Sequence, residues 1–351
     1  MTARLDDFPL RAFKLEGRAL SCAPYGRGHI NETYLAETDA GRQYILQKIN
    51  SRVFRDVPGL MENIAGVTEH LRKKEKDARR VLRLVPALDG GNYIYREDGY
   101  WRVYDYVTDS LSLDTPETEQ DFAESAAAFG RFQRQLADFP AEKLHETIPD
   151  FHDTKKRYLA LHEAIDKDVL GRAADARQEI AFALSRESGV DELMAGLREG
   201  RLPLRVTHND TKLNNVLFDA ATRRSLCVID LDTVMPGLCA NDFGDSIRFG
   251  ASTAAEDERD LDKVSLSLDL YRAYSKAFLG ACGGSLAQEE IASLPSGARM
   301  MTLECGVRFL TDYLSGDTYF RIHREGHNLD RCRTQFKLVQ DMEEKWSEMR
   351  L

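Results

Sequence analysis

The sequence has no long apolar run, no excess of positive charge and no closely spaced pair of cysteines. No stretch reaches the roughly 18 consecutive apolar residues that a membrane-spanning helix needs, which argues against an integral membrane protein. Lys and Arg total 48 against 58 Asp and Glu, for a formal net charge of −10. A nucleic-acid binder, which needs a concentrated basic face, is therefore disfavoured.

The remaining composition is that of an ordinary globular protein. The six cysteines are scattered and the first ten residues lack the apolar core of a secretory signal, so we expect reduced thiols and a cytoplasmic location. With 351 residues, 42% hydrophobic and 30% charged, the chain is long enough for two lobes with separate cores or for one large domain.

The first hundred residues read as strands separated by glycine turns, with one helix between them. The helix begins at Pro58 and places Leu60, Ile64, Val67 and Leu71 at three- and four-residue spacing. β-Branched and aromatic runs bounded by turn residues predict strands over 19–24, 33–38, 43–49, 92–96 and 100–107. We therefore expect a small α+β lobe over residues 1–107.

Beyond residue 116 the pattern becomes helical. Phe122, Phe129 and Leu136 belong to an apolar stripe at helical spacing, which predicts a long helix. Further helices are predicted over 154–198, 257–281, 299–315 and 331–349, with one β-rich island over 205–231. The fold class is thus α+β and bilobal, with a larger, mainly helical lobe over 108–351 and a connector near 104–110.

The β-rich island contains the residues that predict chemistry. Residues 215–218 and 226–229 flank a polar turn near residue 222, as in an antiparallel hairpin. Folding the hairpin brings Asp230 beside Asn215, and Asp210 lies in the loop at the same end. Hard oxygen ligands of this kind suit Mg²⁺, which usually takes one or two carboxylates plus substrate phosphates.

The spacing of these residues follows a kinase pattern. His208-Asn209-Asp210, followed five residues later by Asn215, keeps the spacing of the protein-kinase string H-R-D-x-x-x-x-N. In that string the Asp is the catalytic base and the Asn binds metal, so Asp210 is the predicted base and Asn215 and Asp230 the predicted metal ligands. The alternative is that these residues only cap and turn the chain, as Asp and Asn often do.

A second aspartate-rich segment matches a kinase metal-binding motif, but we do not interpret it as the metal site. Asp242-Phe243-Gly244 spells the kinase metal motif, but it lies far downstream of Asn215 and does not directly end a strand. We interpret Asp242 and Asp245 as structural residues that bond the backbone of the catalytic loop. Asp232 could instead assist Asp230 or hold a second metal ion, and His208 is interpreted as a residue that braces the loop.

The nucleotide is expected in the first lobe. Gly26, Gly28 and His29 lie in a turn between two predicted strands, where backbone N–H groups can cover phosphates. For His29 the alternative is a solvated loop tip. The connector adds Tyr104, Tyr106 and Val107 as candidate nucleotide contacts.

Lys48 is the candidate phosphate-binding lysine. It shares one face of its predicted strand with Tyr44 and Leu46, an unusual place for a charge unless it meets a phosphate. Glu62, on the following helix, is the preferred ion-pair partner, with Glu69 as the alternative. Lys48 could also be a solvated charge on an edge strand.

Together these segments resemble the aminoglycoside phosphotransferase and choline kinase group of the kinase-like fold, and within it the N-acetylhexosamine 1-kinases. The resemblance spans nearly the whole chain, and the segments that carry it are 28–31, 208–215, 229–237, 242–248, 308–314 and 325–331. It implies transfer of a phosphoryl group from ATP to the anomeric hydroxyl of N-acetylglucosamine or N-acetylgalactosamine. The implied partners are Mg²⁺, ATP and an amino sugar.

The resemblance also implies roles for individual residues. Asp210 would be the base, Asn215 and Asp230 the Mg²⁺ ligands, and Lys48 the phosphate lysine. The helical lobe would supply the sugar pocket, for which the candidates beside Asp210 are Arg308, Asp312, Tyr319 and Arg321. An alternative for Glu304, Arg308 and Asp312, at i, i+4 and i+8, is an ion ladder on a helix surface.

Two rival functions stay open. One is a kinase for another small hydroxyl compound, such as choline or an aminoglycoside, although Arg308 and Arg321 would be unfavourable near a polycation. The other is a non-catalytic nucleotide-binding scaffold, which we would expect to lack Lys48, Asp210 or Asp230. The sequence does not fix the oligomeric state.

Overall fold

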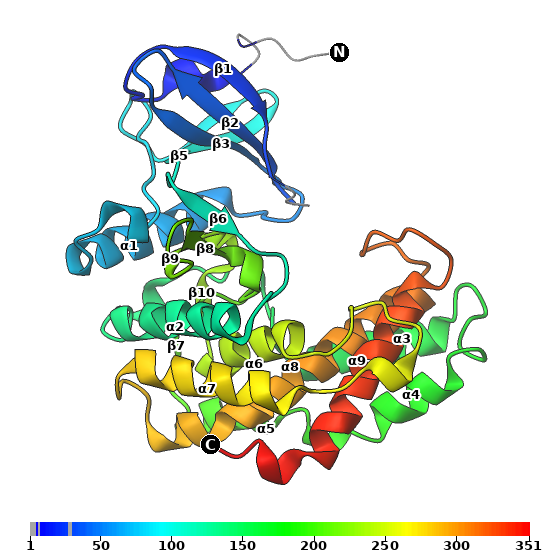
Figure 1. Ribbon diagram of the computed structural model, residues 1–351. Helices are drawn as coiled ribbons and strands as arrows, with labels where there is room; N and C mark the ends of the chain where they lie inside the picture. Colours follow the sequence, from blue (N-terminus) through cyan, green and yellow to red (C-terminus); the bar gives the residue numbers. More distant parts are fainter. Residues whose placement is uncertain (1–4, 6–7, 27–29) are drawn as a thin grey trace.

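The computed structural model describes residues 5, 8–26 and 30–351 and shows two lobes stacked on one another (Figure 1). The smaller lobe is built around a β-sheet, and the larger one is mainly helical. The expected α+β class and bilobal arrangement are thus confirmed. None of the helices within the described residues is both long and apolar enough to cross a membrane.

The sheet of the small lobe is antiparallel, and its strands lie in the order β1 (Ala19–Pro24), β2 (Glu32–Thr38), β3 (Gln43–Ile49), β5 (Gly99–Asp105) and β4 (Ile94–Arg96). Its two faces are covered differently. Leu46 and Trp101 pack against Phe8 and Phe13 on the outer face. Ile49, on the opposite face, belongs to the hydrophobic cluster of helix α1 (Val57–Lys74).

Local capping explains where the first helices begin. The side chain of Asp56 accepts a hydrogen bond from the backbone of Gly59 at the start of α1, and Pro58 lies in its first turn, where the missing N–H costs nothing. Helix α2 (Glu119–Gln135) begins with a capping box between Thr118 and Asp121. Both starts lie within three residues of the predicted apolar stripes.

The larger lobe is a packed set of helices. After α2 come α3 (Thr154–Lys167), α4 (Arg177–Leu184), α5 (Glu192–Arg198), α6 (Cys239–Gly250), α7 (Leu268–Cys282), α8 (Gln288–Leu314) and α9 (His327–Glu344). α2 packs on α7, and α8 packs on both α6 and α9. Gly244 of α6 lies so close to α8 that a Cβ there would be 2.3 Å from the carbonyl oxygen of Gly297, so the close approach requires glycine.

Two small sheets of the larger lobe lie between the small-lobe sheet and the helices (Figure 1). β6 (Ser110–Ser112) pairs with β8 (Val216–Asp219), which pairs with β9 (Ser225–Val228), while β7 (Arg205–Thr207) pairs with β10 (Met235–Gly237). The predicted hairpin is therefore confirmed. The small-lobe sheet ends at Asp105, and β6 already pairs with β8, so the chain crosses between the lobes at 106–109. The division at 107/108 into a nucleotide-binding lobe and a catalytic lobe stays a prediction.

Three helical predictions were inaccurate. α6 was not predicted at all, α7 begins at Leu268 rather than near 257, and α8 begins at Gln288 rather than 299 and runs through Pro295. The buried side chains that these helices share form the main core of the larger lobe. Leu213, in the segment between β7 and β8, belongs to the same core.

Candidate active site

The catalytic loop joins β7 to β8, and the hairpin brings its ends together. The backbone N–H of Ile229 donates to the carbonyl oxygen of Asn215 at 2.9 Å, and Val216 lies opposite Val228 in the ladder. Asp230, the next residue, therefore lies beside Asn215, as the sequence predicted. Asp230 has a left-handed backbone conformation, with φ 58°, which is uncommon for a residue other than glycine.

Asp210 is held between an amide and an ammonium group. The Nδ2 of Asn215 donates to Asp210 Oδ2 at 3.0 Å and to its backbone carbonyl at 2.8 Å. The Nζ of Lys212 lies 2.8 Å from Asp210 Oδ1. Burial alone would raise the pKa of Asp210, but the Lys212 charge and bond, with the Asn215 bond, outweigh it and lower that pKa. Asp210 is thus a carboxylate at neutral pH.

Lys212 is a site residue that the sequence interpretation missed. Its pKa is raised, because the carboxylates of Asp210 and Asp245 outweigh the effect of burial. The lysine is therefore a fixed positive charge beside the predicted base. Its position two residues after Asp210, inside the motif itself, was the available signal.

The surroundings of Asp230 fit a divalent cation. Asp230 is exposed as a residue, while the desolvation of its carboxylate by the surrounding protein and the neighbouring carboxylates of Asp232 and Asp210 raise its pKa to about 6. The nitrogen of Asn215 faces Asp210, which leaves the amide oxygen as the atom that can bind a cation. Among the described residues no group of three or more His, Cys, Asp or Glu forms a metal site alone. One amide oxygen and one or two carboxylates, completed by phosphates, are a donor set typical of Mg²⁺.

The backbone of the catalytic loop is bonded to buried carboxylates of α6. The carboxylate of Asp242 accepts the N–H groups of His208 at 2.9 Å and Asn209 at 2.7 Å. Asp245 accepts the N–H of Thr211 at 2.9 Å. The structural interpretation of both aspartates is confirmed, and Asp242-Phe243-Gly244 lies within a helix rather than at the end of a strand.

His208 braces the loop, as expected. Its Nε2 lies 2.9 Å from the carbonyl oxygen of Ile229, and its ring meets Phe129 and Phe132 edge-on. The histidine is fully buried. It therefore connects the catalytic loop to the strand that precedes Asp230.

The predicted pairing of Lys48 with Glu62 is wrong. Lys48 Nζ lies 4.0 Å from Glu32 and 3.9 Å from Asp98, and 5.6 Å from the ring centre of Trp101, on the outer face of the sheet. Glu62 Oε2 instead meets His145 Nε2 at 2.7 Å. Alternation along β3 had placed Lys48 correctly with Tyr44 and Leu46, but that face is the one covered by the N-terminal segment.

The other predicted nucleotide contacts are only partly placed. Gly26 has φ 77° in the turn after β1, while Gly28 and His29 lie outside the described residues. The Tyr106 hydroxyl lies 3.3 Å from that of Tyr25. Tyr104 and Val107 are buried in the hydrophobic cluster at the junction of the lobes. Contact of these residues with a nucleotide stays a prediction.

Two of the predicted acceptor residues lie together. The guanidinium of Arg308 lies 5.8 Å from the ring centres of both Phe151 and Tyr319 and 5.4 Å from that of Phe320. Tyr319 is 70% exposed. Arg321 is exposed as well.

Asp312 does not present a free carboxylate to an acceptor. Its oxygens accept the N–H groups of Thr318, Tyr319 and Phe320 at 2.8–2.9 Å and the side-chain amide of Asn328 at 2.9 Å. The carboxylate of Asp312 is thus engaged within the protein and shapes the segment that carries Tyr319, which disfavours the predicted direct contact with a substrate. The surface ion ladder is wrong, since Glu304 and Asp312 are both buried.

A histidine links the catalytic loop to this group. His152 Nε2 lies 3.4 Å from the carbonyl oxygen of Asn209, and His152 Nδ1 lies 3.1 Å from Glu304 Oε1, one turn before Arg308 on α8. Burial would raise the pKa of Glu304, but His152, Arg308 and Thr154 outweigh it and lower that pKa. Asn209, which precedes Asp210, is thus connected to Arg308 through His152 and Glu304.

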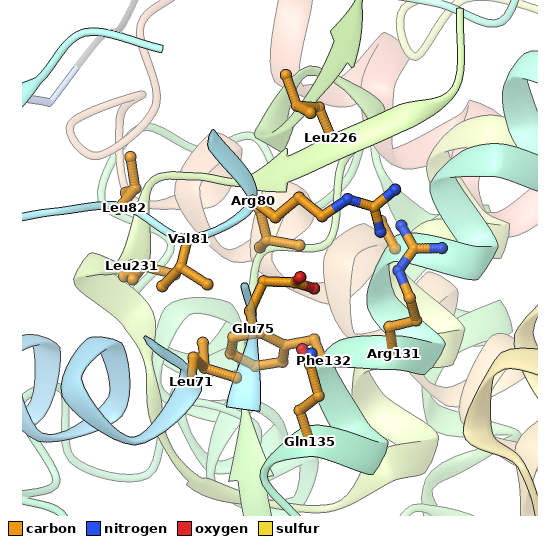
Figure 2. A pocket seen from close by; sticks show the side chains of 12 residues that line it. Leu71, Glu75, Arg80, Val81, Leu82, Arg131, Phe132, Gln135, Leu226 and Leu231 are labelled. Carbon is orange, nitrogen blue, oxygen red and sulfur yellow. The ribbon is translucent and has the colours of Figure 1, made fainter. Parts of the chain in front are cut away.

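A separate pocket lies behind the catalytic hairpin. Figure 2 shows Glu75, Arg80 and Arg131 around this space, with apolar side chains such as Leu71 and Phe132 in its wall. None of the residues that line it is among the predicted site residues. The pocket therefore does not belong to the site around Asp210.

Comparisons with solved structures show proteins of similar overall fold. The aminoglycoside phosphotransferase of Alicyclobacillus acidocaldarius has a similar structure, with a TM-score of 0.64 at 13% identity over 97% of this chain and 95% of that chain. The amicoumacin kinase hAmiN, solved with AMP-PNP, Ca²⁺ and amicoumacin, has a TM-score of 0.61 at 15% identity over 93% and 91%. The choline kinase of Cryptosporidium parvum has a TM-score of 0.58 at 14% identity over 93% and 90%.

These similarities confirm the protein-kinase-like fold that the sequence predicted. The sequence pattern of the phosphotransferase enzyme family, APH, matches residues 21–275, which is more than half of the chain. The chain therefore belongs to the APH phosphotransferase enzyme family.

Proposed function

We propose that the protein is an ATP- and Mg²⁺-dependent kinase that phosphorylates the anomeric hydroxyl of an N-acetylhexosamine. The observation that carries the proposal is the ionised carboxylate of Asp210, held between Lys212 and Asn215 at the end of the hairpin that presents Asp230. An ionised, partly exposed carboxylate that can still accept a hydroxyl, beside a donor set for a cation, is the arrangement that kinases use.

Each residue has a defined task in this proposal. Asp210 accepts a hydrogen bond from the acceptor hydroxyl, orients it and takes its proton. Lys212 keeps Asp210 ionised and adds positive charge near the transferred group. Asn215 and Asp230 would hold Mg²⁺, which neutralises charge on the phosphates when bound. Because phosphoryl transfer has a loose transition state, positioning and charge neutralisation supply most of the catalysis.

The acceptor side supports a neutral sugar rather than a cation. Arg308 lies among three aromatic rings, and burial and the nearby charge of Arg308 lower the pKa of Arg157. Two neighbouring arginines would repel a cationic acceptor such as choline or an aminoglycoside. Kinases of these two compounds are among the proteins of similar structure. Aromatic faces and arginine N–H groups suit the apolar ring face and the amide oxygen of an N-acetylated sugar.

The nucleotide is proposed to bind at the small lobe, residues 1–107, with the larger lobe, 108–351, supplying catalysis and acceptor binding. The turn that contains Gly26, Gly28 and His29 would cover the phosphates, and the connector with Tyr106 would contact the base. Among the sugar candidates, Arg308 and Tyr319 are the proposed contacts, and Arg321 lies in the same exposed segment.

A panel of acceptors tests the proposal. ADP release is measured with Mg²⁺ and ATP for N-acetylglucosamine, N-acetylgalactosamine, glucosamine, choline and an aminoglycoside. We expect turnover with an N-acetylhexosamine and at least about tenfold lower kcat/KM with glucosamine, because a missing hydrogen-bonding group weakens binding of the transition state. Turnover of choline or the aminoglycoside alone would overturn the acceptor, and turnover of none would overturn the function.

A further inference from the structure

The small lobe carries a buried cation on the face of its sheet that meets the other lobe, and that cation is not Lys48. Side chains alternate along β3, so Gln47 lies on the face opposite to Lys48. Gln47 is paired across the ladder with Arg102 of β5, and the two side chains bond directly. Arg102 Nε and Nη2 donate to Gln47 Oε1 at 3.0 and 2.8 Å.

Arg102 reaches from the small lobe to the loop that follows Asp230. Its Nη1 lies 2.5 Å from Asp232 Oδ1, and only 1% of the Arg102 side chain is exposed. The same Nη1 faces the sulfur of Met61 on α1 at 3.9 Å. The guanidinium is enclosed by protein on every side, so it acts through its neighbours rather than by touching a ligand.

Asp232 is held from two directions. While Arg102 pairs with Oδ1, the side-chain amide of Asn31 donates to Oδ2 at 2.5 Å. Asn31 comes directly before β2, at the end of the glycine turn, and its own Oδ1 accepts the backbone N–H of Asn50 at 2.9 Å. Asp232 therefore ties the segment that contains Asp230 to both β5 and the turn expected over the phosphates.

In protein kinases, a lysine on the third strand pairs with a glutamate on the following helix, and this ion pair must be in place for catalysis. Here the inner face of β3 carries Gln47 instead of a lysine. On α1, Met61 faces Arg102, and the carboxylate of Glu62 bonds His145 rather than a residue of β3. We infer that Arg102 is a positioning residue that is the buried cation on this face without contacting the phosphates, and that Arg102 and Asn31, through Asp232, set the place of the metal-binding segment against the small lobe.

This inference rests on the proposed function only in taking a nucleotide with Mg²⁺ as the ligand. It is tested by calorimetric titration of the full chain with ADP, with and without Mg²⁺, which needs no acceptor. In Arg102→Lys the charge stays, but a single ammonium cannot bond Gln47 twice and Asp232 as well. We expect the Mg²⁺-dependent gain in ADP affinity to fall at least about fivefold, with Mg²⁺-free affinity within about twofold of the original protein.

The matched control is the reverse exchange on the other face of the sheet, Lys48→Arg, which should keep the full gain. A folded Arg102→Lys protein with the full gain would overturn the inference. If Arg102→Lys does not fold, Asn31→Ala decides, since Asn31 is only half-buried and leaves Asp232 intact. A reduced gain in Asn31→Ala supports the inference, and an unchanged gain overturns it. Failure of every acceptor in turnover assays would sink the proposed function but leave these binding results valid.

Discussion

The catalytic loop and the acceptor segment 315–326 are both shaped by a buried aspartate, but they differ in how far their own residues are buried. Asp242 accepts two successive backbone N–H groups in the catalytic loop, and Asp312 accepts three in the acceptor segment. Both regions have further bonds, and Asp317 of the acceptor segment pairs with Arg172 and accepts the side-chain amide of Asn328. Thr211 is bonded to Asp245 and Ser246, and the hydroxyl of Thr233 donates to the His208 carbonyl at 2.6 Å.

The difference in burial leads us to expect that the catalytic loop governs the chemical step and the acceptor segment governs acceptor selectivity. Residues of the catalytic loop are mostly buried, whereas Tyr319 and Arg321 of the acceptor segment are exposed. Figure 1 shows the acceptor segment as the orange loop between α8 and α9, away from the packed helices. Segments with fewer buried contacts open more easily and tolerate change better. We therefore expect substitutions in the first region to lower kcat and those in the second to alter acceptor affinity.

Removing the base should have the largest effect. In Asp210→Asn we expect kcat to fall about 10³-fold, because general-base catalysis and hydroxyl orientation are both lost. Binding of ADP with Mg²⁺, measured by calorimetry, should stay within a few-fold, since Asn215 and Asp230 are unchanged. Near-normal turnover by this variant would show that Asp210 is not the base.

Loosening the catalytic loop should come next. In Asp242→Asn one carboxylate oxygen that accepts a loop N–H is replaced by a donor, so we expect kcat to fall by about 10- to 100-fold and the free energy of unfolding to fall by about 2 kcal/mol. The acceptor KM should change little. Steady-state kinetics and urea unfolding measure these effects. A changed acceptor KM with normal kcat would contradict the proposed difference between the catalytic loop and the acceptor segment.

The pH dependence of metal binding is a third test of the catalytic region. Because the pKa of Asp230 is raised to about 6 and Mg²⁺ binds the carboxylate, protonation competes with the metal below that pH. The Mg²⁺ concentration for half-maximal rate should be level above pH 7 and rise by up to about tenfold for each pH unit below 6. A flat profile down to pH 5 would show that Asp230 is not a ligand.

Loosening the acceptor segment should have a smaller and different effect. In Asp312→Asn the backbone at 318–320 loses part of its anchor, so we expect the acceptor KM to rise about tenfold with kcat within about twofold. The KM for ATP should not change. A large loss of kcat would place the acceptor segment with the catalytic loop and end the contrast between them.

The smallest effect is expected at Lys48. Lys48→Met should change the KM for ATP by less than about twofold, because Lys48 faces Glu32, Asp98 and Trp101 on the outer side of the sheet and exposed ion pairs contribute little. A tenfold rise in that KM would restore Lys48 as the phosphate lysine.

Local patterns were sufficient to predict much of the fold. Alternation predicted the strands and the hairpin, and the hairpin placed Asp230 beside Asn215. α6 was missed because nearly all of its residues are buried, so that no polar face marks a helical period. Pro295 hid the start of α8, since proline in a helix interior removes a hydrogen bond and normally marks an end.

The site was predictable where its residues are close in sequence. Asp210 and Asn215 are separated by one loop, and spacing alone related them. Alternation placed Lys48 on one face of the sheet, but only the packing of the N-terminal segment shows that this is the outer face. Arg102 contacts Asp232 only when the two lobes are assembled. Asp312 could not be recognised as an anchor, because its partners are backbone groups that any sequence supplies.

The product of a single reaction shows directly whether the phosphate goes to the anomeric oxygen and whether Asp210 is needed. The protein is incubated with ATP, Mg²⁺ and N-acetylglucosamine, and the sugar is examined by proton and phosphorus NMR. We predict an α- or β-anomeric proton coupled to phosphorus, formed by the original protein and not by Asp210→Asn. Phosphate on any other oxygen, or equal product from the Asp210→Asn protein, would contradict it.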